Sequence, residues 1–283
     1  MPFFEANDGT RLFYRDWGRE NRTKRPILFL SSWSLSSVMW QYQMVELERQ
    51  GHRCIALDRR GHGRSDEPDD GYDFDTLADD VARLVEKLDL RDLVIVGHSM
   101  GSGEAVRYFG RHGRGRVAGL ALVGTILPFL RKTDDNPEGV DVQFFEATRA
   151  RWREDFTRWM DDSTDAYVGK GLPGSAISEG LVEWTKADML STSVRTLIAC
   201  NMAVSDTDFR EEMRAIDVPT IFIHGTHDAS ISLALGPKRA AQLVPNSRLE
   251  VYENAPHGLY MTHRERLNRD LLAFVAECGG KVR

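Results

Sequence analysis

Three kinds of feature are scarce in this sequence, and each absence argues against a class of protein. Only three cysteines occur among 283 residues, at Cys54, Cys200 and Cys278. Their odd number and scattered spacing predict free thiols in a reducing compartment rather than a disulfide framework. No apolar run approaches the roughly 20 residues that a membrane helix needs, and the N-terminus lacks the basic start and apolar core of a signal peptide. We therefore expect a cytoplasmic protein with no membrane partner.

An excess of basic charge is also missing. The chain has 37 Lys and Arg residues against 43 Asp and Glu residues, which gives a net charge of −6. Without a basic surface the chain has no means of releasing counterions from a nucleic acid, so we expect no nucleic-acid partner. Hydrophobic residues make up 41 % and charged residues 28 %, an ordinary globular composition. A chain of this length can bury enough apolar surface to fold without disulfides or a metal ion.

Short apolar segments alternate with segments of helical character along most of the chain. Asn7-Asp8-Gly9 lies between two extended runs and predicts an N-terminal hairpin. The alternation that follows predicts an α/β fold with a mostly parallel sheet and right-handed crossovers. The expected strands cover residues 26–30, 53–57, 93–96, 117–123, 220–223 and 248–252, and the expected helices cover 38–50, 75–88, 99–112, 233–243 and 264–277.

A long insertion interrupts this alternation. We predict residues 1–129 and 218–283 as one α/β core and residues 130–217 as a helical cap. Aromatic residues recur at helical spacing in the first half of the insertion. They either only pack the insertion onto the core or partly wall a binding pocket under a lid. These residues are Phe144, Phe145, Trp152, Phe156 and Trp159.

The motif Gly97-His98-Ser99-Met100-Gly101 directly follows an apolar strand and begins a segment of helical character. A strand-to-helix turn of this kind forces its central residue into a strained conformation, and its glycines avoid collisions with neighbouring strands. The Ser99 hydroxyl would stand near a helix N-terminus, which favours developing negative charge. Alternatively, Ser99 only caps the helix. We predict Ser99 as a catalytic nucleophile and expect the His98 side chain to point elsewhere.

A serine nucleophile needs a base, and two loops after strands offer partners in the required order. Asp228 would orient the imidazole of His257, and His257 would take the proton from Ser99. The alternatives are a helix-capping aspartate and a solvent-exposed loop histidine. His224, His227 and Asp228 together resemble a metal cluster, but a third ligand at a recognisable spacing is lacking. We therefore expect no metal and no cofactor.

Two backbone N–H groups are needed to stabilise an oxyanion, each contributing roughly 3–4 kcal/mol. We predict the N–H of Met100, which follows the nucleophile, as one donor. The loop Ser31-Ser32-Trp33-Ser34 follows an apolar strand and would supply the second donor, the N–H of Trp33. The Trp33 indole either walls the acyl pocket or packs in the core under the 38–50 helix.

With these residues in place, the chain resembles α/β-hydrolases of the arylesterase and cofactor-free haloperoxidase (perhydrolase) group. The resemblance implies an eight-stranded, mostly parallel sheet flanked by helices, a helical cap, a triad of Ser99, Asp228 and His257, and oxyanion donors at Trp33 and Met100. Similar proteins often associate as homo-oligomers. The motifs that carry the resemblance are Asp8-Gly-Thr, Asp16-Trp-Gly18, Met39-Trp-Gln-Tyr-Gln-Met44, Asp58-Arg-Arg-Gly-His-Gly-Arg-Ser65, Gly97-His-Ser-Met-Gly101, Thr207-Asp-Phe-Arg210, Asp217-Val-Pro-Thr220 and Ala255-Pro-His-Gly258.

The loop before Trp33 departs from the family pattern. The family usually carries His-Gly where Ser31-Ser32 stands, although the related enol-lactone hydrolases also carry small polar residues there. Members that favour peroxide as acyl acceptor tend to place Pro at the position of Ser34, so this serine favours water. We therefore predict a serine hydrolase that cleaves small carboxylic esters through an acyl-enzyme.

Several alternatives remain at this point. Lactone hydrolysis and perhydrolase or haloperoxidase activity would use the same residues, and so would hydrolysis of a carbon–carbon bond. A dehalogenase or epoxide hydrolase on the same fold needs a carboxylate nucleophile, which Ser99 disfavours. A receptor that only binds a small molecule under its cap has no need of His257. In each enzymatic case the expected partner is a small-molecule substrate.

Overall fold

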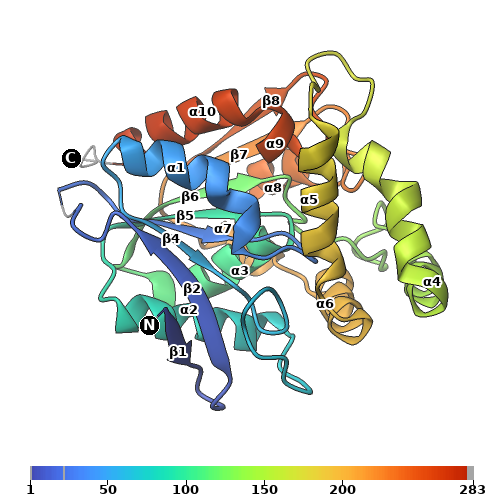
Figure 1. Cartoon of the computed structure of the whole chain (residues 1–283), viewed down its shortest axis with the longest axis horizontal. Helices are drawn as coiled ribbons and strands as arrows, with labels where there is room; N and C mark the ends of the chain where they lie inside the picture. Colours follow the sequence, from blue (N-terminus) through green and yellow to red (C-terminus); the bar gives the residue numbers. More distant parts are fainter. Residues whose placement is uncertain (1, 22, 279–283) are drawn as a thin grey trace.

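The computed structural model describes residues 2–21 and 23–278, and within them the chain forms an eight-stranded sheet. Its strand order is β1-β2-β4-β3-β5-β6-β7-β8 (Figure 1). The N-terminal hairpin pairs antiparallel, β2 also runs antiparallel to β4, and the remaining strands pair parallel, as predicted. The strands are β1 (Phe3–Glu5), β2 (Arg11–Trp17), β3 (Ile27–Leu30), β4 (Cys54–Leu57), β5 (Leu93–His98), β6 (Val117–Val123), β7 (Thr220–Gly225) and β8 (Ser247–Tyr252).

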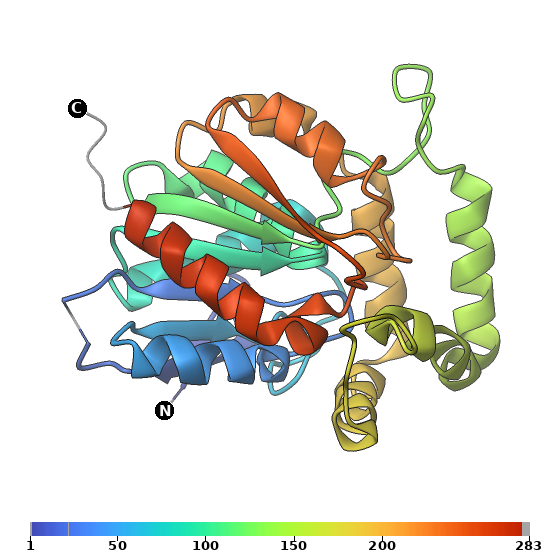
Figure 2. The same cartoon turned by 90° about the horizontal axis from the view of Figure 1, so that it is seen from above.

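The central strands are apolar along their whole length because both faces of the sheet are covered. Leu28 and Leu30 of β3 belong to one hydrophobic cluster, whereas Ile27 and Phe29 belong to a second cluster on the opposite face. Figures 1 and 2 show α1 and α10 on one face and α2, α3 and α8 on the other. These helices are α1 (Gln41–Arg49), α2 (Phe74–Lys87), α3 (Met100–Tyr108), α8 (Pro237–Leu243) and α10 (Arg264–Glu277).

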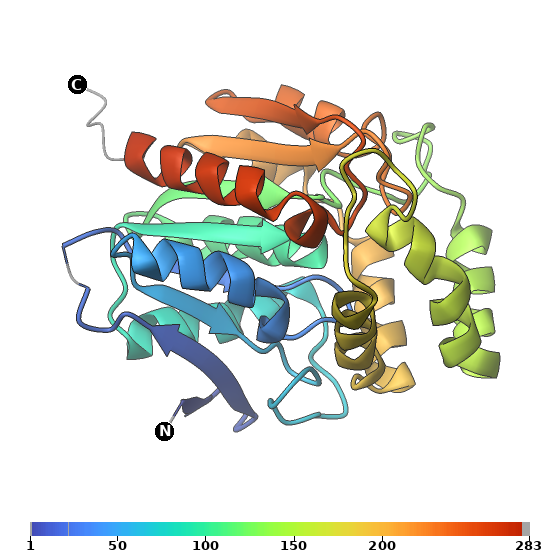
Figure 3. The same cartoon turned by 45° about the horizontal axis from the view of Figure 1, so that its top comes forward.

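The insertion between β6 and β7 is helical and lies beyond the carboxyl ends of the parallel strands, whose arrowheads point towards it in Figure 3. Loops at that edge of a parallel sheet are the usual place for a binding site. The inserted helices are α4 (Val142–Val168), α5 (Glu179–Leu190), α6 (Val194–Asp206) and the short α7 (Arg210–Arg214). Asp155 has non-helical backbone angles and breaks α4 into two segments. Its carboxylate accepts the N–H of Arg158, which caps the second segment.

Two predicted helices have different ends in the structure. The helix expected over 233–243 begins only at Pro237, because Gly236 has a non-helical backbone and the ring of Pro237 suits a first helical position. The helix expected to reach residue 112 ends as an α-helix at Tyr108 and continues as one wider π-turn over Phe109–Gly113. The short α9 (Leu259–Thr262) precedes α10. Among the described helices, none combines the length and the apolar character that a bilayer span requires.

Candidate active site

Ser99 occupies the junction between β5 and α3 with a backbone that is strained for a side chain-bearing residue. Its φ is 53° and its ψ is −116°. Its N–H donates to the carbonyl of Val123 at the end of β6, at 2.9 Å, which holds the turn against the neighbouring strand. The residue is 7 % exposed and lines a cavity of about 500 Å³. The strained turn therefore places the side chain of Ser99 at the wall of this cavity.

The two glycines that flank this serine have separate steric reasons. A Cβ at Gly101 would overlap the carbonyl of Leu30 on β3, so α3 could not approach the sheet. A Cβ at Gly97 would instead overlap the carbonyl of Gly101. The expected collision with a neighbouring strand thus holds for Gly101, whereas the obstacle at Gly97 is the first turn of the following helix.

Asp228 and His257 meet at the edge of the sheet where β7 and β8 end. Asp228 follows β7 and His257 follows β8, and both are buried. The Nδ1–H of His257 donates to Oδ2 of Asp228 at 2.7 Å, which leaves Nε2 as the ring atom free to accept a proton. His257 lines the same cavity as Ser99. The structure therefore brings together the three residues that the motifs predicted, from three separate loops at one edge of the sheet.

The Asp228 carboxylate accepts three hydrogen bonds and has the ring of His224 close by. Its Oδ1 accepts the N–H groups of Ser230 at 2.9 Å and Ile231 at 2.8 Å, and its Oδ2 lies 3.2 Å from Nε2 of His224 in addition to its bond with His257. Burial by itself would raise the pKa of Asp228. The pKa is nevertheless lowered, because the two histidines and the Ile231 N–H stabilise the charged form. The carboxylate therefore stays ionised at neutral pH and fixes the tautomer of His257.

His224 is a buried neighbour of the triad whose part in the site the sequence did not predict. Its Nε2 is 2.8 Å from the carbonyl of Ile231 as well as close to Asp228, so this nitrogen carries the proton. Burial lowers the pKa of His224, which keeps the ring neutral. His227, its partner in the alternative metal motif, is exposed and lies against Thr226. Within residues 2–21 and 23–278, no group of three or more His, Cys, Asp or Glu side chains is placed to hold a metal ion.

His98, the residue before the nucleophile, also supports the site by contacting the loop of His257. Its Nε2 lies 2.9 Å from the carbonyl of His257, and the two rings are 4.7 Å apart. Burial lowers the pKa of His98 to about 3, so the ring is neutral and donates from Nε2. His98 thus fixes the backbone of the loop that carries His257.

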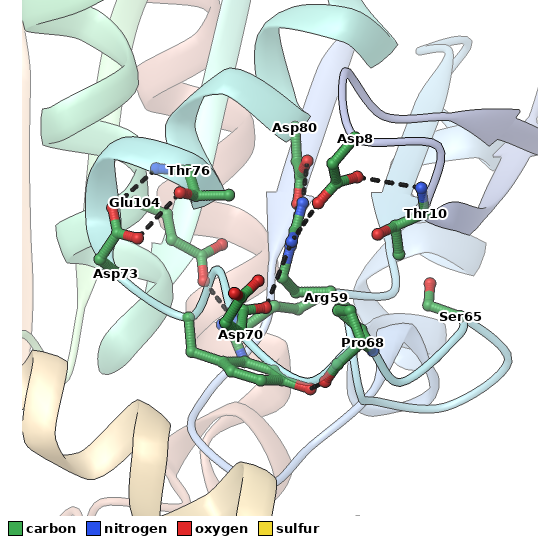
Figure 4. A network of polar contacts seen from close by, with 12 residues as sticks. Asp8, Thr10, Arg59, Ser65, Pro68, Asp70, Asp73, Thr76, Asp80 and Glu104 are labelled. Carbon is green, nitrogen blue, oxygen red and sulfur yellow. Dashed lines mark hydrogen bonds and ion pairs between the residues drawn. The ribbon is translucent and has the colours of Figure 1, made fainter.

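The two predicted oxyanion donors lie on different elements, Trp33 on the loop after β3 and Met100 at the start of α3. The backbone N–H of Trp33 has no acceptor among the described residues, and Met100 is the first residue of α3, where an N–H has no intrahelical partner. Arg59 stabilises the loop after β3 by donating to the carbonyls of Ser31 at 2.6 Å and Ser32 at 3.2 Å. Figure 4 shows Arg59 beside Glu104 of α3, with which it forms a buried ion pair.

The Trp33 indole packs against the insertion rather than under the 38–50 helix. Its Nε1 donates to the carbonyl of Leu197 on α6 at 2.9 Å, and its ring stacks on Trp152 of α4 with centroids 4.6 Å apart. Trp159 meets the same indole edge-on at 6.1 Å. Of the five aromatic residues in the predicted helical stripe, four line the cavity and Phe156 packs behind them. Four residues of the stripe therefore lie at the cavity wall, whereas Phe156 only packs the insertion.

Tyr167, near the end of α4, is a further cavity residue that the sequence gave no reason to select. Its ring meets the ring of His257 with centroids 5.5 Å apart, and its carbonyl accepts the N–H of Gly258 at 2.8 Å. Its hydroxyl lies 3.4 Å from that of Tyr260, and burial raises the pKa of Tyr167. The end of α4 is therefore attached directly to the loop of His257.

Comparisons with known proteins agree with this geometry. Residues 25–264 match a family model described as alpha/beta hydrolase fold. The chain is 42 % identical over 279 residues to a non-heme haloperoxidase from Rhodococcus erythropolis, covering 97 % of this chain and 99 % of that protein. It is 36 % identical over 277 residues to a bifunctional esterase/perhydrolase from Acinetobacter calcoaceticus, with the same coverage. The structure of an esterase from Exiguobacterium antarcticum superposes with a TM-score of 0.90 at 29 % identity, covering 97 % of this chain and 98 % of that one.

Proposed function

The chain belongs to the α/β-hydrolase fold family, and from that membership we propose that it is a serine hydrolase that takes an acyl group from a small carboxylic ester onto Ser99. The acyl group then passes to water or to hydrogen peroxide. The observation that carries the proposal is the 2.7 Å bond from His257 to an ionised Asp228, at a cavity that Ser99 also lines. Under the same proposal, residues 130–217 act as a cap over this cavity.

Each proposed residue has one part in the reaction. Ser99 Oγ attacks the ester carbonyl while Nε2 of His257 takes its proton, and the backbone N–H groups of Trp33 and Met100 stabilise the oxyanion. His257 then gives the proton to the leaving alcohol. In the second half, His257 takes a proton from the acceptor as it attacks the acyl-enzyme, and Ser99 recovers its hydrogen when the acid departs.

The acyl acceptor is the point at which the comparisons add most to the sequence. Ser34 by itself favours water, and its φ of 66° is a conformation that proline cannot adopt. The relatives named haloperoxidase and perhydrolase support the alternative, in which peroxide competes with water. Peroxide attack on the acyl-enzyme releases a peracid. A peracid transfers one oxygen atom to a halide, giving hypohalous acid and the carboxylic acid, so the peroxide supplies the oxidising equivalents.

The test is the Ser99→Ala variant, assayed for release of 4-nitrophenol from short-chain esters and for peracid formation in added hydrogen peroxide. Both rates should fall on the order of 10³-fold or more, because both need the same acyl-enzyme. A serine-directed phosphonate should label Ser99 in the wild type and leave the variant unlabelled, as seen by mass spectrometry. Peracid formation that survives in Ser99→Ala would show that peroxide is activated elsewhere and would refute the common intermediate.

A further inference from the structure

Arg149 of α4 is a buried cation without a paired carboxylate. The residue is 7 % exposed. Its Nη1 donates to Oδ1 of Asn201 at 3.0 Å and lies 3.5 Å from Oγ of Ser205, both on α6. Among the described residues, none of the ion pairs involves Arg149. Because a buried charge without a counterion is costly, this arrangement points to an anion that is supplied from outside the chain.

Among the described residues, no carboxylate contacts Arg149 directly. Ser205 donates to Oδ1 of Asp206 at 2.9 Å, which makes Asp206 the carboxylate connected most directly to Arg149. Asp206 also pairs with Arg131 at 3.3 Å. Asp206 therefore already has a cation as its partner and is connected to Arg149 only through the hydroxyl of Ser205.

Asn201 connects this charge to the cavity. Asn201 lines the cavity, whereas Arg149 lies behind it. A guanidinium group has only donors, so its bond to Asn201 fixes Oδ1 towards Arg149 and turns Nδ2 the other way. Nδ2 has no acceptor among the described residues. The neighbouring cavity wall is apolar, with Phe145 and Val204 in one hydrophobic cluster. The amide is therefore an oriented donor on an otherwise apolar stretch of wall.

Asn201 also lies on the same side as one of the proposed oxyanion donors. The indole of Trp33 donates to the carbonyl of Leu197, one helical turn before Asn201 on α6. We therefore place the acyl part of the substrate, whose carbonyl oxygen would meet these donors, on the side of Asn201.

We propose that the substrate is an ester or lactone whose acyl chain carries a second, ionised carboxyl group, bound by Nδ2 of Asn201 and attracted by the charge of Arg149. This inference rests on the proposed function, since it names the acyl part of the substrate for that same site. Hydrogen bonds to charged groups are stronger than those between neutral groups, so a carboxylate is preferred over a neutral chain of equal length.

The test compares two series of chromogenic substrates. One contains 4-nitrophenyl monoesters of succinic, glutaric and adipic acid, and the other contains 4-nitrophenyl esters of unbranched monocarboxylic acids of matching length. For the best chain length, the wild type should show the higher kcat/KM with the carboxylate-bearing ester. Asn201→Leu should lower the ratio of the two kcat/KM values about tenfold. Asn246→Leu, the same change at an exposed asparagine outside the cavity, should keep the wild-type ratio.

A second variant distinguishes loss of substrate binding from loss of the folded structure. Asn201→Asp supplies the missing counterion to Arg149, so its melting temperature should not fall, while its charge repels the substrate carboxylate and should reduce the ratio further. Calorimetric binding of adipate to Ser99→Ala, with and without Asn201→Asp, tests the site without any turnover. Equal ratios in all variants, or adipate binding that Asn201→Asp leaves unchanged, would overturn the inference. Failure of the wild type to hydrolyse any neutral ester would instead count against the proposed function.

Discussion

At the scale of single residues, the triad carboxylate depends on a second histidine that never reaches the substrate. Nε2 of His224 donates to the carbonyl of Ile231 and lies 3.2 Å from Oδ2 of Asp228, and burial keeps the His224 ring neutral. In His224→Leu the carboxylate loses this polar neighbour, which helps to lower the pKa of Asp228, so that pKa should rise. We expect the acidic limb of the kcat/KM profile to move to higher pH by roughly half a unit to one unit, measured from pH 4 to 9.

The control for this prediction comes from the same motif. His227→Leu makes the same change at an exposed ring and should leave the acidic limb in place. A His224→Gln variant retains a side-chain N–H and should restore part of the shift. If His224→Leu lowers the rate at every pH without moving the limb, His224 only supports the packing of the loop.

At the scale of elements, the half-buried carboxylate of Asp188 helps to attach α5 to the core. Asp188 accepts the N–H of Ser36 at 3.0 Å and its hydroxyl at 2.7 Å, and burial raises the pKa of Asp188. Thr185 and Met189 of the same helix line the cavity. In Asp188→Asn an amide NH₂ group faces a donor of Ser36, so α5 should be held less firmly, by about 1–2 kcal/mol.

The expected result for Asp188→Asn is a KM raised several-fold with a smaller change in kcat, because the wall of the cavity moves while the loops of the triad stay in place. Steady-state kinetics with a 4-nitrophenyl ester measures both constants. Glu183→Gln removes an exposed carboxylate from the same helix and should leave KM unchanged. An equal loss of kcat and kcat/KM in Asp188→Asn would mean that α5 acts in the chemical step instead.

At the scale of the whole molecule, two buried arginines join parts of the chain that are far apart in sequence. Arg59 connects the loop after β3 to Glu104 of α3. Arg60 connects Asp80 of α2 to Asp8 of the N-terminal hairpin. Figure 4 shows Arg59 with Glu104, Asp80 and Asp8. Removing one partner of a buried pair leaves an uncompensated charge. Glu104→Gln should therefore destabilise the fold by roughly 3–5 kcal/mol.

Thermal unfolding followed by circular dichroism measures this loss as a fall of several degrees in the melting temperature. The matched control is Glu277→Gln, which breaks the exposed pair with Arg248 and should cost about 1 kcal/mol or less. Equal melting temperatures for the two variants would show that the buried pair contributes no more than a surface pair.

The sequence by itself determined the class of fold and most of its strands. Continuous apolar runs such as Ile27–Leu30 predict strands covered on both faces, because period and hydrophobicity are local properties. The two glycines around Ser99 and the order of the later loops predicted which residues should meet. The ends of helices were harder to predict: α8 begins late because Gly236 adopts a backbone that its residue type permits but does not require.

Only the tertiary structure decided how those residues are supported. The hydrogen bonds from His98 to the carbonyl of His257 and from His257 to Asp228 join segments that are distant in sequence, and no local pattern encodes them. The charge of Arg149 reaches the cavity through Asn201 only because α4 and α6 pack side by side. The sequence has few cysteines and no excess of basic residues, so its composition did not indicate a site, and only the motif around Ser99 did. The pKa values of the buried groups around Ser99 depend on burial and on contacts between distant segments. Only the tertiary structure decides these, because it determines which helices cover the edge of the sheet.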